Sequence, residues 1–167
     1  HRASGSNARL RGANLSAARL SKSDLPAVSL REAMLRDCIL HNAEWRDADL
    51  QDTDCRGLEA TGAVLTDALV RRATVDGAHF GGATLTGADF RNATGEKADF
   101  SNAALTDTVI RDVTFKDCEF HAAALEATVA TDAVFDSCDF EEATLTSAQM
   151  VNTDCTDSGF VDCSLRR

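Results

Sequence analysis

Large apolar residues recur at every fifth position of this chain. Positions 10, 15, 20 and onward to 165 make 32 slots, and 27 of them hold Leu, Ile, Val, Met, Phe or Trp. The slots two residues earlier hold Ala in 19 of 32 cases, and neither set contains a charged residue. A helix turns about 100° per residue and would spread this pattern over every face, whereas a continuous strand would alternate its faces. The period therefore predicts short extended pieces separated by bends, each turning one small and one large side chain inward.

A second period of twenty residues predicts how the bends close. The same residue type returns at this interval in a phenylalanine series and in an arginine series: Phe80, Phe100, Phe120, Phe140 and Phe160; Arg11, Arg31, Arg71, Arg91 and Arg111. Four five-residue units thus make one coil, and equivalent residues stack on the coil above. We expect an all-β, four-sided parallel solenoid of about eight coils, with no inserted loop and no terminal helix.

The last residue of each five-residue unit's bend is often Gly, Asn, Asp or Ser, which are the residue types typical of turns. Such residues stand at Gly12, Asn42, Gly62, Gly77, Gly82, Gly87, Asn92 and Asn102.

This register resembles the pentapeptide-repeat family, whose unit reads roughly Ala-(Asp/Asn)-Leu-X-X. It is present as ANL at 13–15, ADL at 48–50, ADF at 88–90 and 98–100, and CDF at 138–140, and the register covers residues 6–165. The resemblance implies a right-handed quadrilateral β-helix.

Two places depart from the pattern of large and small inward residues. Leu58 is large in a small slot and Ala60 is small in a large slot, so we expect the two to have exchanged volume. Gly95 has no such compensation nearby. We expect either a small void there or a space filled by Phe115 of the next coil.

Length and charge narrow the class of protein. We interpret residues 1–6 as a tag remnant and residues 7–167 as a single repeat domain. No apolar run approaches the ~18 residues of a membrane span, so we expect no membrane contact. The net charge is −10, and residues 61–167 carry all of it, with eight basic and eighteen acidic side chains. This balance argues against direct nucleic-acid binding, which uses cations on phosphates, and suits a partner with a basic groove.

Catalysis, cofactors and metals find no support in the residue pattern. The six cysteines include no CxxC spacing and all occupy inward slots, where we interpret them as core fillers. Cys118 and Cys138 stack one coil apart; we expect free thiols, although their separation leaves a disulfide open. His41 and His121 share a column but lie four coils apart, too far for a common metal. We therefore predict neither an enzyme nor a cofactor or metal site.

Two outward columns are the candidate interaction surface. One is acidic and is interrupted by His79; the other is flat and nearly uncharged. Their members are Glu59, Asp99, Glu119 and Asp139, and Val64, Thr84, Ala104, Ala124 and Thr144. A third column, the arginine series, is expected to be neutralised by its acidic neighbours, with binding of an acidic partner as the alternative. These neighbours are Glu32, Asp49, Asp52, Asp89 and Asp112.

The predicted function is a non-catalytic scaffold for an unidentified protein partner, with a homodimer through end-to-end or wall contact as one form. The family resemblance implies an alternative, an acidic DNA mimic that binds DNA gyrase or topoisomerase IV and protects it from quinolones or toxins. The missing loops and C-terminal helix are departures from gyrase-directed members. A stalk within a longer secreted or lumenal protein is a third interpretation. The compartment stays open, with the cytoplasm slightly favoured over a lumen or periplasm.

Overall fold

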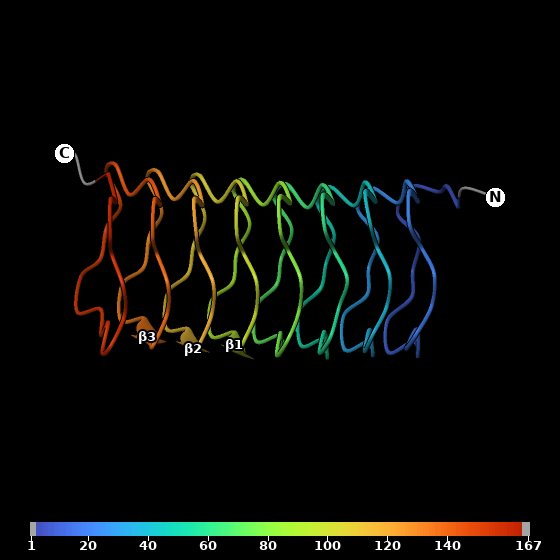
Figure 1. The fold of residues 1–167 in the computed structure, drawn as a ribbon. Helices are drawn as coiled ribbons and strands as arrows, with labels where there is room; N and C mark the ends of the chain where they lie inside the picture. Colours follow the sequence, from blue (N-terminus) through green and yellow to red (C-terminus); the bar gives the residue numbers. More distant parts are fainter. Residues whose placement is uncertain (1–2, 165–167) are drawn as a thin grey trace.

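The computed structural model describes residues 3–164 as a straight rod in which the chain winds through stacked, four-sided coils (Figure 1). Each outward residue at the middle of a wall forms a parallel bridge with the residue twenty positions later. These bridges run without a break from Ser4↔Asp24 to Thr144↔Ser164. No helix and no inserted loop interrupts the register within these residues, so the expected all-β solenoid is confirmed.

Hydrogen bonds between coils hold the rod together. In each unit the amide of the large inward residue donates to the coil above, as Leu10 N does to Ser29 O at 2.7 Å, and Ser29 N donates back to Ala8 O at 2.8 Å. A third bond leaves the corner, from Gly12 N to Arg31 O at 2.8 Å. Because these bonds join neighbouring coils, each coil is supported mainly by the two beside it.

Three segments are long enough to count as strands, and all lie on one wall. β1 (Thr94–Glu96), β2 (Thr114–Lys116) and β3 (Val134–Asp136) form a parallel sheet in the order β1-β2-β3. Gly95 pairs with Phe115, and Phe115 pairs with Phe135. The strands appear as short arrows along the lower side of the rod (Figure 1).

The corners are turns, as the bend residues predicted, and each described corner has one residue in the left-handed backbone conformation. The second bend residue has a positive φ in each unit from Asn7 to Asp162, between 50° and 71°. In most units the following small residue closes the turn, as Ala13 N does on Leu10 O at 3.0 Å. A positive φ at the third residue of a four-residue turn is the geometry of a type II turn, which favours Gly and Asn. Asn and Asp hold most corners that lack Gly, since their side chains tolerate this conformation best.

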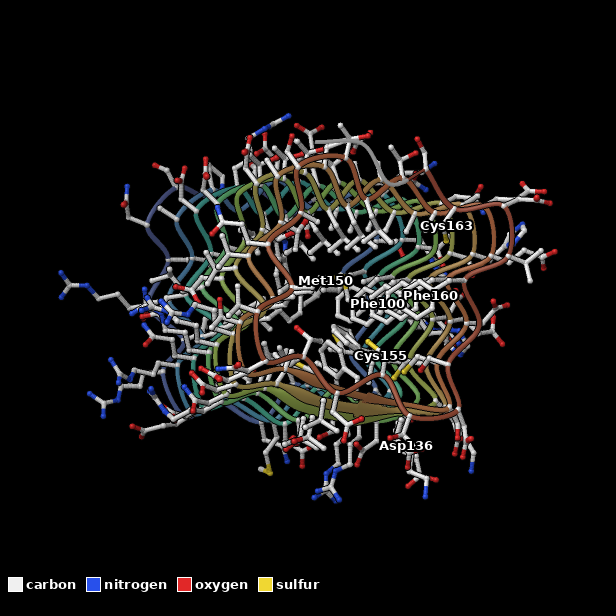
Figure 2. The ribbon with its side chains drawn as sticks, turned by 90° about the vertical axis from the view of Figure 1, so that its left-hand side faces the viewer. Phe100, Asp136, Met150, Cys155, Phe160 and Cys163 are labelled. Atoms are coloured by element: carbon white, nitrogen blue, oxygen red, sulfur yellow. The ribbon has the colours of Figure 1, made fainter. Side chains whose placement is uncertain are left out.

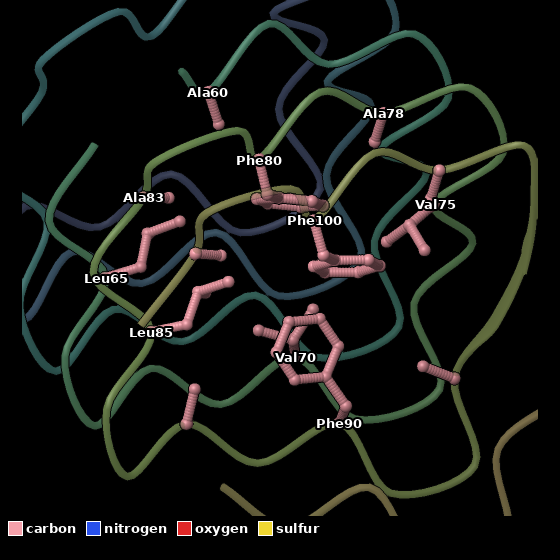
Figure 3. Close-up of a cluster of buried hydrophobic side chains, with 14 of the residues drawn as sticks. Ala60, Leu65, Val70, Val75, Ala78, Phe80, Ala83, Leu85, Phe90 and Phe100 are labelled. Carbon is pink, nitrogen blue, oxygen red and sulfur yellow. The ribbon is translucent and has the colours of Figure 1, made fainter. Parts of the chain in front are cut away.

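The core is a stack of side chains along the axis. Phe80, Phe100, Phe120, Phe140 and Phe160 lie one above another, with ring centroids 4.7–5.1 Å apart and planes within 9°. Figure 2 looks along this stack and shows Phe100 and Phe160 on one side of the interior and Met150 on the facing side. In the close-up of Figure 3, Phe90 meets Phe100 edge-on, at 5.9 Å and 80°.

The two departures from the size pattern are both accommodated. Leu58 and Ala60 are both buried, at 1% and 0% exposure. At Gly95 the space is filled: a Cβ there would lie 2.7 Å from Cγ2 of Val75 and 3.3 Å from Cδ1 of Phe115. Of the two alternatives for Gly95, the void is therefore wrong.

A small unfilled cavity lies beside Ala130, in contrast to the filled space at Gly95. Ala130 occupies a large inward slot, and the apolar cavity of about 10 Å³ opens beside it. The lining is apolar apart from one threonine: Ile110, Leu125, Thr128, Ala130, Phe135, Phe140, Leu145, Ala148 and Met150. A space of this size holds no substrate, so the cavity bears on stability.

Candidate interaction surface

The four walls place the two candidate columns side by side. The acidic column lies on the wall whose inward residues are the stacked phenylalanines, and the neutral column lies on the next wall along the chain. Both columns are continuous ladders, through Glu59↔His79↔Asp99↔Glu119↔Asp139 and through Val64↔Thr84↔Ala104↔Ala124↔Thr144. The corner residues at 61–62, 81–82, 101–102, 121–122 and 141–142 separate them; we call this line of corners the shared edge. The sequence-predicted residues thus form one surface folded around one edge of the rod.

Two of the four acidic side chains are occupied by the backbone. Asp99 Oδ1 accepts the amide of Ser101 at 2.8 Å, and Asp139 Oδ1 accepts the amide of Glu141 at 2.9 Å. The same contact occurs on other walls, for example from Arg56 N to Asp54 Oδ1. This is an Asx-type turn, in which a carboxylate caps the amide two residues on. The aspartate of the repeating unit therefore supports the corner, whatever else it does.

Glu59 and Glu119 differ from these aspartates, because the extra methylene carries the carboxylate away from the corner. Within residues 3–164 neither carboxylate has a hydrogen-bond or ion-pair partner.

Histidines gather along the same edge. Among the described residues His121 lies on the shared edge, His41 lies at the corner one coil before it, and His79 lies on the adjoining wall. His79 Nδ1 lies 3.9 Å from Asp99 Oδ2, and His121 Nδ1 lies 3.9 Å from Glu141 Oε2. All of these side chains are substantially exposed, so each contact is weak in water.

The neutral column is a smooth surface. Its five side chains are small and partly exposed, and residues 81–87 and 101–106 contain no charge at all. Thr66, Thr86 and Thr106 continue the surface toward the next corner. A partner can approach such a wall closely, without stripping water from charged groups.

The arginine series lies on the opposite corner and is mostly paired. Arg11 meets Glu32 at 2.7 Å, and Arg31 meets Asp52 at 3.5 Å. Asp89 lies between two arginines, 2.6 Å from Arg71 and 2.7 Å from Arg91. The expected neutralisation is thus confirmed for these four arginines.

Two of the acidic residues assigned to that neutralisation behave otherwise. Asp49 bonds Gln51, from Nε2 to Oδ1 at 3.0 Å, and not an arginine. Asp112 has no arginine partner, and the Arg111 guanidinium has no ion pair within residues 3–164. The expectation was wrong for these because Val109 replaces the mid-wall aspartate that would reach Arg111.

A recurring ion triad was missed at the sequence level. Arg36, Asp54 and Arg56 repeat the arrangement of Arg71, Asp89 and Arg91, with one arginine 18 residues before the aspartate and one two residues after. Two hydrogen bonds from Arg56 and one from Arg36 lower the pKa of Asp54 against the opposing effect of burial. For Asp89 burial is the largest influence and raises the pKa, but the two arginines together outweigh it and lower the pKa overall. The spacing of 18 and two residues is the signal that could have predicted both triads.

Four of the six cysteines are buried as expected, whereas Cys155 and Cys163 near the C-terminal end of the rod are partly exposed, so the expectation was wrong for these two. All six are free, and Cys38, Cys55, Cys118 and Cys138 are buried. Burial raises the pKa of Cys38 to about 11 and that of Cys55 to about 12, so neither is a nucleophile at neutral pH. Among the described residues no three His, Cys, Asp or Glu side chains come together as metal ligands, and no helix is long and apolar enough to cross a membrane.

Comparison with known proteins matches two families to different parts of the chain. Residues 75–167 match the family described as the SV2A/B/C luminal domain, and residues 6–42 and 29–67 match pentapeptide repeats (8 copies). No curated protein sequence matches.

Solved structures with a similar fold include two pentapeptide-repeat solenoids. HetL, a pentapeptide repeat protein involved in heterocyst differentiation regulation in the cyanobacterium Nostoc sp. strain PCC 7120, is 21% identical with a TM-score of 0.60, over 96% of this chain and 84% of HetL. QnrB1, a plasmid-mediated fluoroquinolone resistance protein, is 14% identical with a TM-score of 0.58, over 98% of this chain and 90% of QnrB1. At these identities the likeness concerns the fold alone.

Proposed function

Because the chain belongs to the pentapeptide-repeat family, and its residues 75–167 to the luminal-domain family, we propose that it is a non-catalytic scaffold that binds a protein partner. The contact surface is the shared edge with its two walls. Glu59 and Glu119 supply carboxylates that no described residue uses, beside a smooth wall of small side chains. The proposal rests on this combination of unpaired carboxylates and an adjoining smooth, uncharged wall.

The matching partner presents a basic, concave surface. Salt bridges from the partner's lysines or arginines to Glu59 and Glu119 set the orientation, and contact with the neutral wall excludes water around them. Because Glu119 is exposed and Glu59 is partly exposed, we expect binding to weaken as salt rises.

The test compares variants of equal charge change. Glu59→Gln with Glu119→Gln removes two charges from the proposed surface, while Asp112→Asn with Glu32→Gln removes two from the opposite corner. Affinity capture followed by a binding titration should show that the first pair weakens a captured partner about tenfold or more and that the second leaves it unchanged. If both double variants lose affinity equally, the effect is due to net charge alone. If neither double variant loses affinity, the proposed surface does not bind the partner.

A second candidate function is mimicry of DNA toward gyrase or topoisomerase IV. The excess of acidic side chains in residues 61–167 supports it, as does the acidic column on one wall. Two observations weigh against it: His79 interrupts the column, and Asp99 and Asp139 already serve the corners. A gyrase supercoiling assay with this protein titrated in decides the matter. If the protein neither inhibits supercoiling nor protects gyrase from a quinolone, the DNA-mimic function is excluded.

The compartment is part of the same proposal. The match of residues 75–167 to a luminal-domain family favours a lumenal location over the cytoplasm. Protease protection of the epitope-tagged natural protein in intact vesicles or organelles is the measurement, and digestion before the membrane is opened would contradict it.

A further inference from the structure

Cys118 and Cys138 occupy equivalent positions in neighbouring coils, behind the acidic column. Their neighbours Glu119 and Asp139 form a parallel bridge, and Asp139 N donates to Cys118 O at 3.0 Å. Both side chains are buried, at 1% and 2% exposure, and both thiols are free. The proposed function uses neither of them.

The two thiols point the same way. Cys118 Sγ donates to Gly95 O at 3.5 Å and to Lys116 O at 3.3 Å. Cys138 Sγ makes the equivalent contacts one coil later, to Phe115 O at 3.5 Å and to Asp136 O at 3.6 Å. Side chains with the same rotamer in adjacent in-register strands keep the strand separation between their ends, so the two sulfurs lie ~4.8 Å apart.

This separation does not favour a disulfide. A disulfide needs sulfurs ~2.05 Å apart and Cβ atoms ~3.8 Å apart, about 1 Å closer than the coils stand. It does suit one cation midway between the sulfurs. Metal–thiolate bonds are ~2.3 Å long, as for zinc, and two of them end to end span ~4.6 Å.

The surroundings restrict which cation fits. No third ligand stands nearby, since no set of three ligating side chains occurs in residues 3–164, so tetrahedral zinc is not expected. Thiolates prefer soft metals. The carbonyl oxygens beside both sulfurs and the burial of the site oppose a net negative charge. A complex of two thiolates with a divalent cation has no net charge, whereas the complex with a monovalent cation keeps a net negative charge.

We propose that Cys118 and Cys138 form a two-thiolate site for a soft divalent d10 cation in linear coordination. Each thiol gives up one proton as its sulfur bonds the metal, so one cation displaces two protons and nothing is oxidised or reduced. The ion enters when the coils open locally, because the closed site is buried.

Mercuric ion is the probe. The reduced protein is unfolded in denaturant, refolded with one equivalent of Hg²⁺, and then exposed to excess glutathione. Native mass spectrometry should find one mercury per chain, lost about tenfold or more slowly than from a single-thiol site, because two linked ligands must leave together. X-ray absorption should report two sulfur ligands and no more.

Three serine variants provide the comparison. Cys118→Ser and Cys138→Ser should lose mercury to glutathione quickly. Both should fold, since Ser158 occupies the next position of this column and bonds Phe135 O at 2.9 Å in the same way. Cys38→Ser is the matched control: Cys38 is a buried thiol of the same column, with Ala18 and Leu58 as its column neighbours, and its loss should leave retention unchanged.

Retention of mercury in Cys118→Ser or Cys138→Ser, or equally fast loss from the parent, would overturn the proposal. So would formation of a Cys118–Cys138 disulfide in preference to the mercury adduct, since it would show that the sulfurs close to bonding distance.

Discussion

Replacing Gly95 by larger residues tests how tightly the solenoid is packed. The slot is a large inward one, so the repeat pattern suggests leucine, yet Val75 and Phe115 fill the space. A Cβ at Gly95 would lie 2.7 Å from Cγ2 of Val75, closer than real Cβ atoms approach, and 3.3 Å from Cδ1 of Phe115. Because Val75 is β-branched, its methyl group cannot turn aside without leaving its preferred rotamer.

The expected cost follows from these contacts. Overpacking by one methyl group in a well-packed core costs about 1–3 kcal/mol, so Gly95→Ala should fall in that range. Gly95→Leu adds three more carbons and should cost more than ~3 kcal/mol. For a chain of this length 1 kcal/mol corresponds to roughly 2–4 °C in Tm, so Gly95→Leu should lower Tm by at least ~6 °C.

A double-mutant cycle locates the clash. Val75→Ala removes the methyl group that a new Cβ would strike, so Gly95→Ala should cost less in that background, with a favourable coupling of about 1 kcal/mol or more. Stability is read by denaturant titration followed by circular dichroism, with equal m-values required before free energies are compared. Full tolerance of Gly95→Leu, or strict additivity in the cycle, would refute the packing argument.

Three further predictions concern stability. Asp89→Asn should lower the free energy of unfolding by ~2 kcal/mol at pH 7, since charged hydrogen bonds to two arginines are lost. Because folding lowers the pKa of Asp89, its stabilising contribution is complete above the unfolded pKa of ~3.9 and disappears as the pH falls through the folded pKa. The denaturant midpoints of parent and variant should therefore converge below about pH 4. Ala130→Val should raise the free energy of unfolding by about 0.5–2 kcal/mol by filling the cavity. As a control, Ala133→Val, in a fully buried small slot, should lower the free energy of unfolding by about 1–3 kcal/mol. A gain in Tm for both variants would contradict the cavity assignment. Ser23→Ala should cost about 1–3 kcal/mol because it removes the acceptor of the buried Trp45 indole N–H, at 2.8 Å; if the Tm stays at that of the parent, the bond is not needed.

Much of this molecule was readable in its sequence, because a strict period leaves little freedom. An unbroken five-residue register with a twenty-residue repeat predicted the coils, the inward slots and the corner residues. It also predicted that the acidic and neutral columns would be continuous, since stacking in register carries each outward residue onto the next. The burial of both Leu58 and Ala60 could be predicted as well, because both occupy inward slots of one unit.

Contacts between coils were not readable to the same degree, because they depend on side-chain direction and on what stands twenty residues away. Whether Gly95 faces a void was decided by a methyl group of Val75 in the preceding coil. The pairing of Asp89 with two arginines, and of Asp99 with a backbone amide, follows from rotamers that a period does not specify. Periodicity alone thus determined the backbone and the placing of residues on its walls. The three-dimensional packing decided which carboxylates are committed to the fold and which, like those of Glu59 and Glu119, have no hydrogen-bond or ion-pair partner among the described residues.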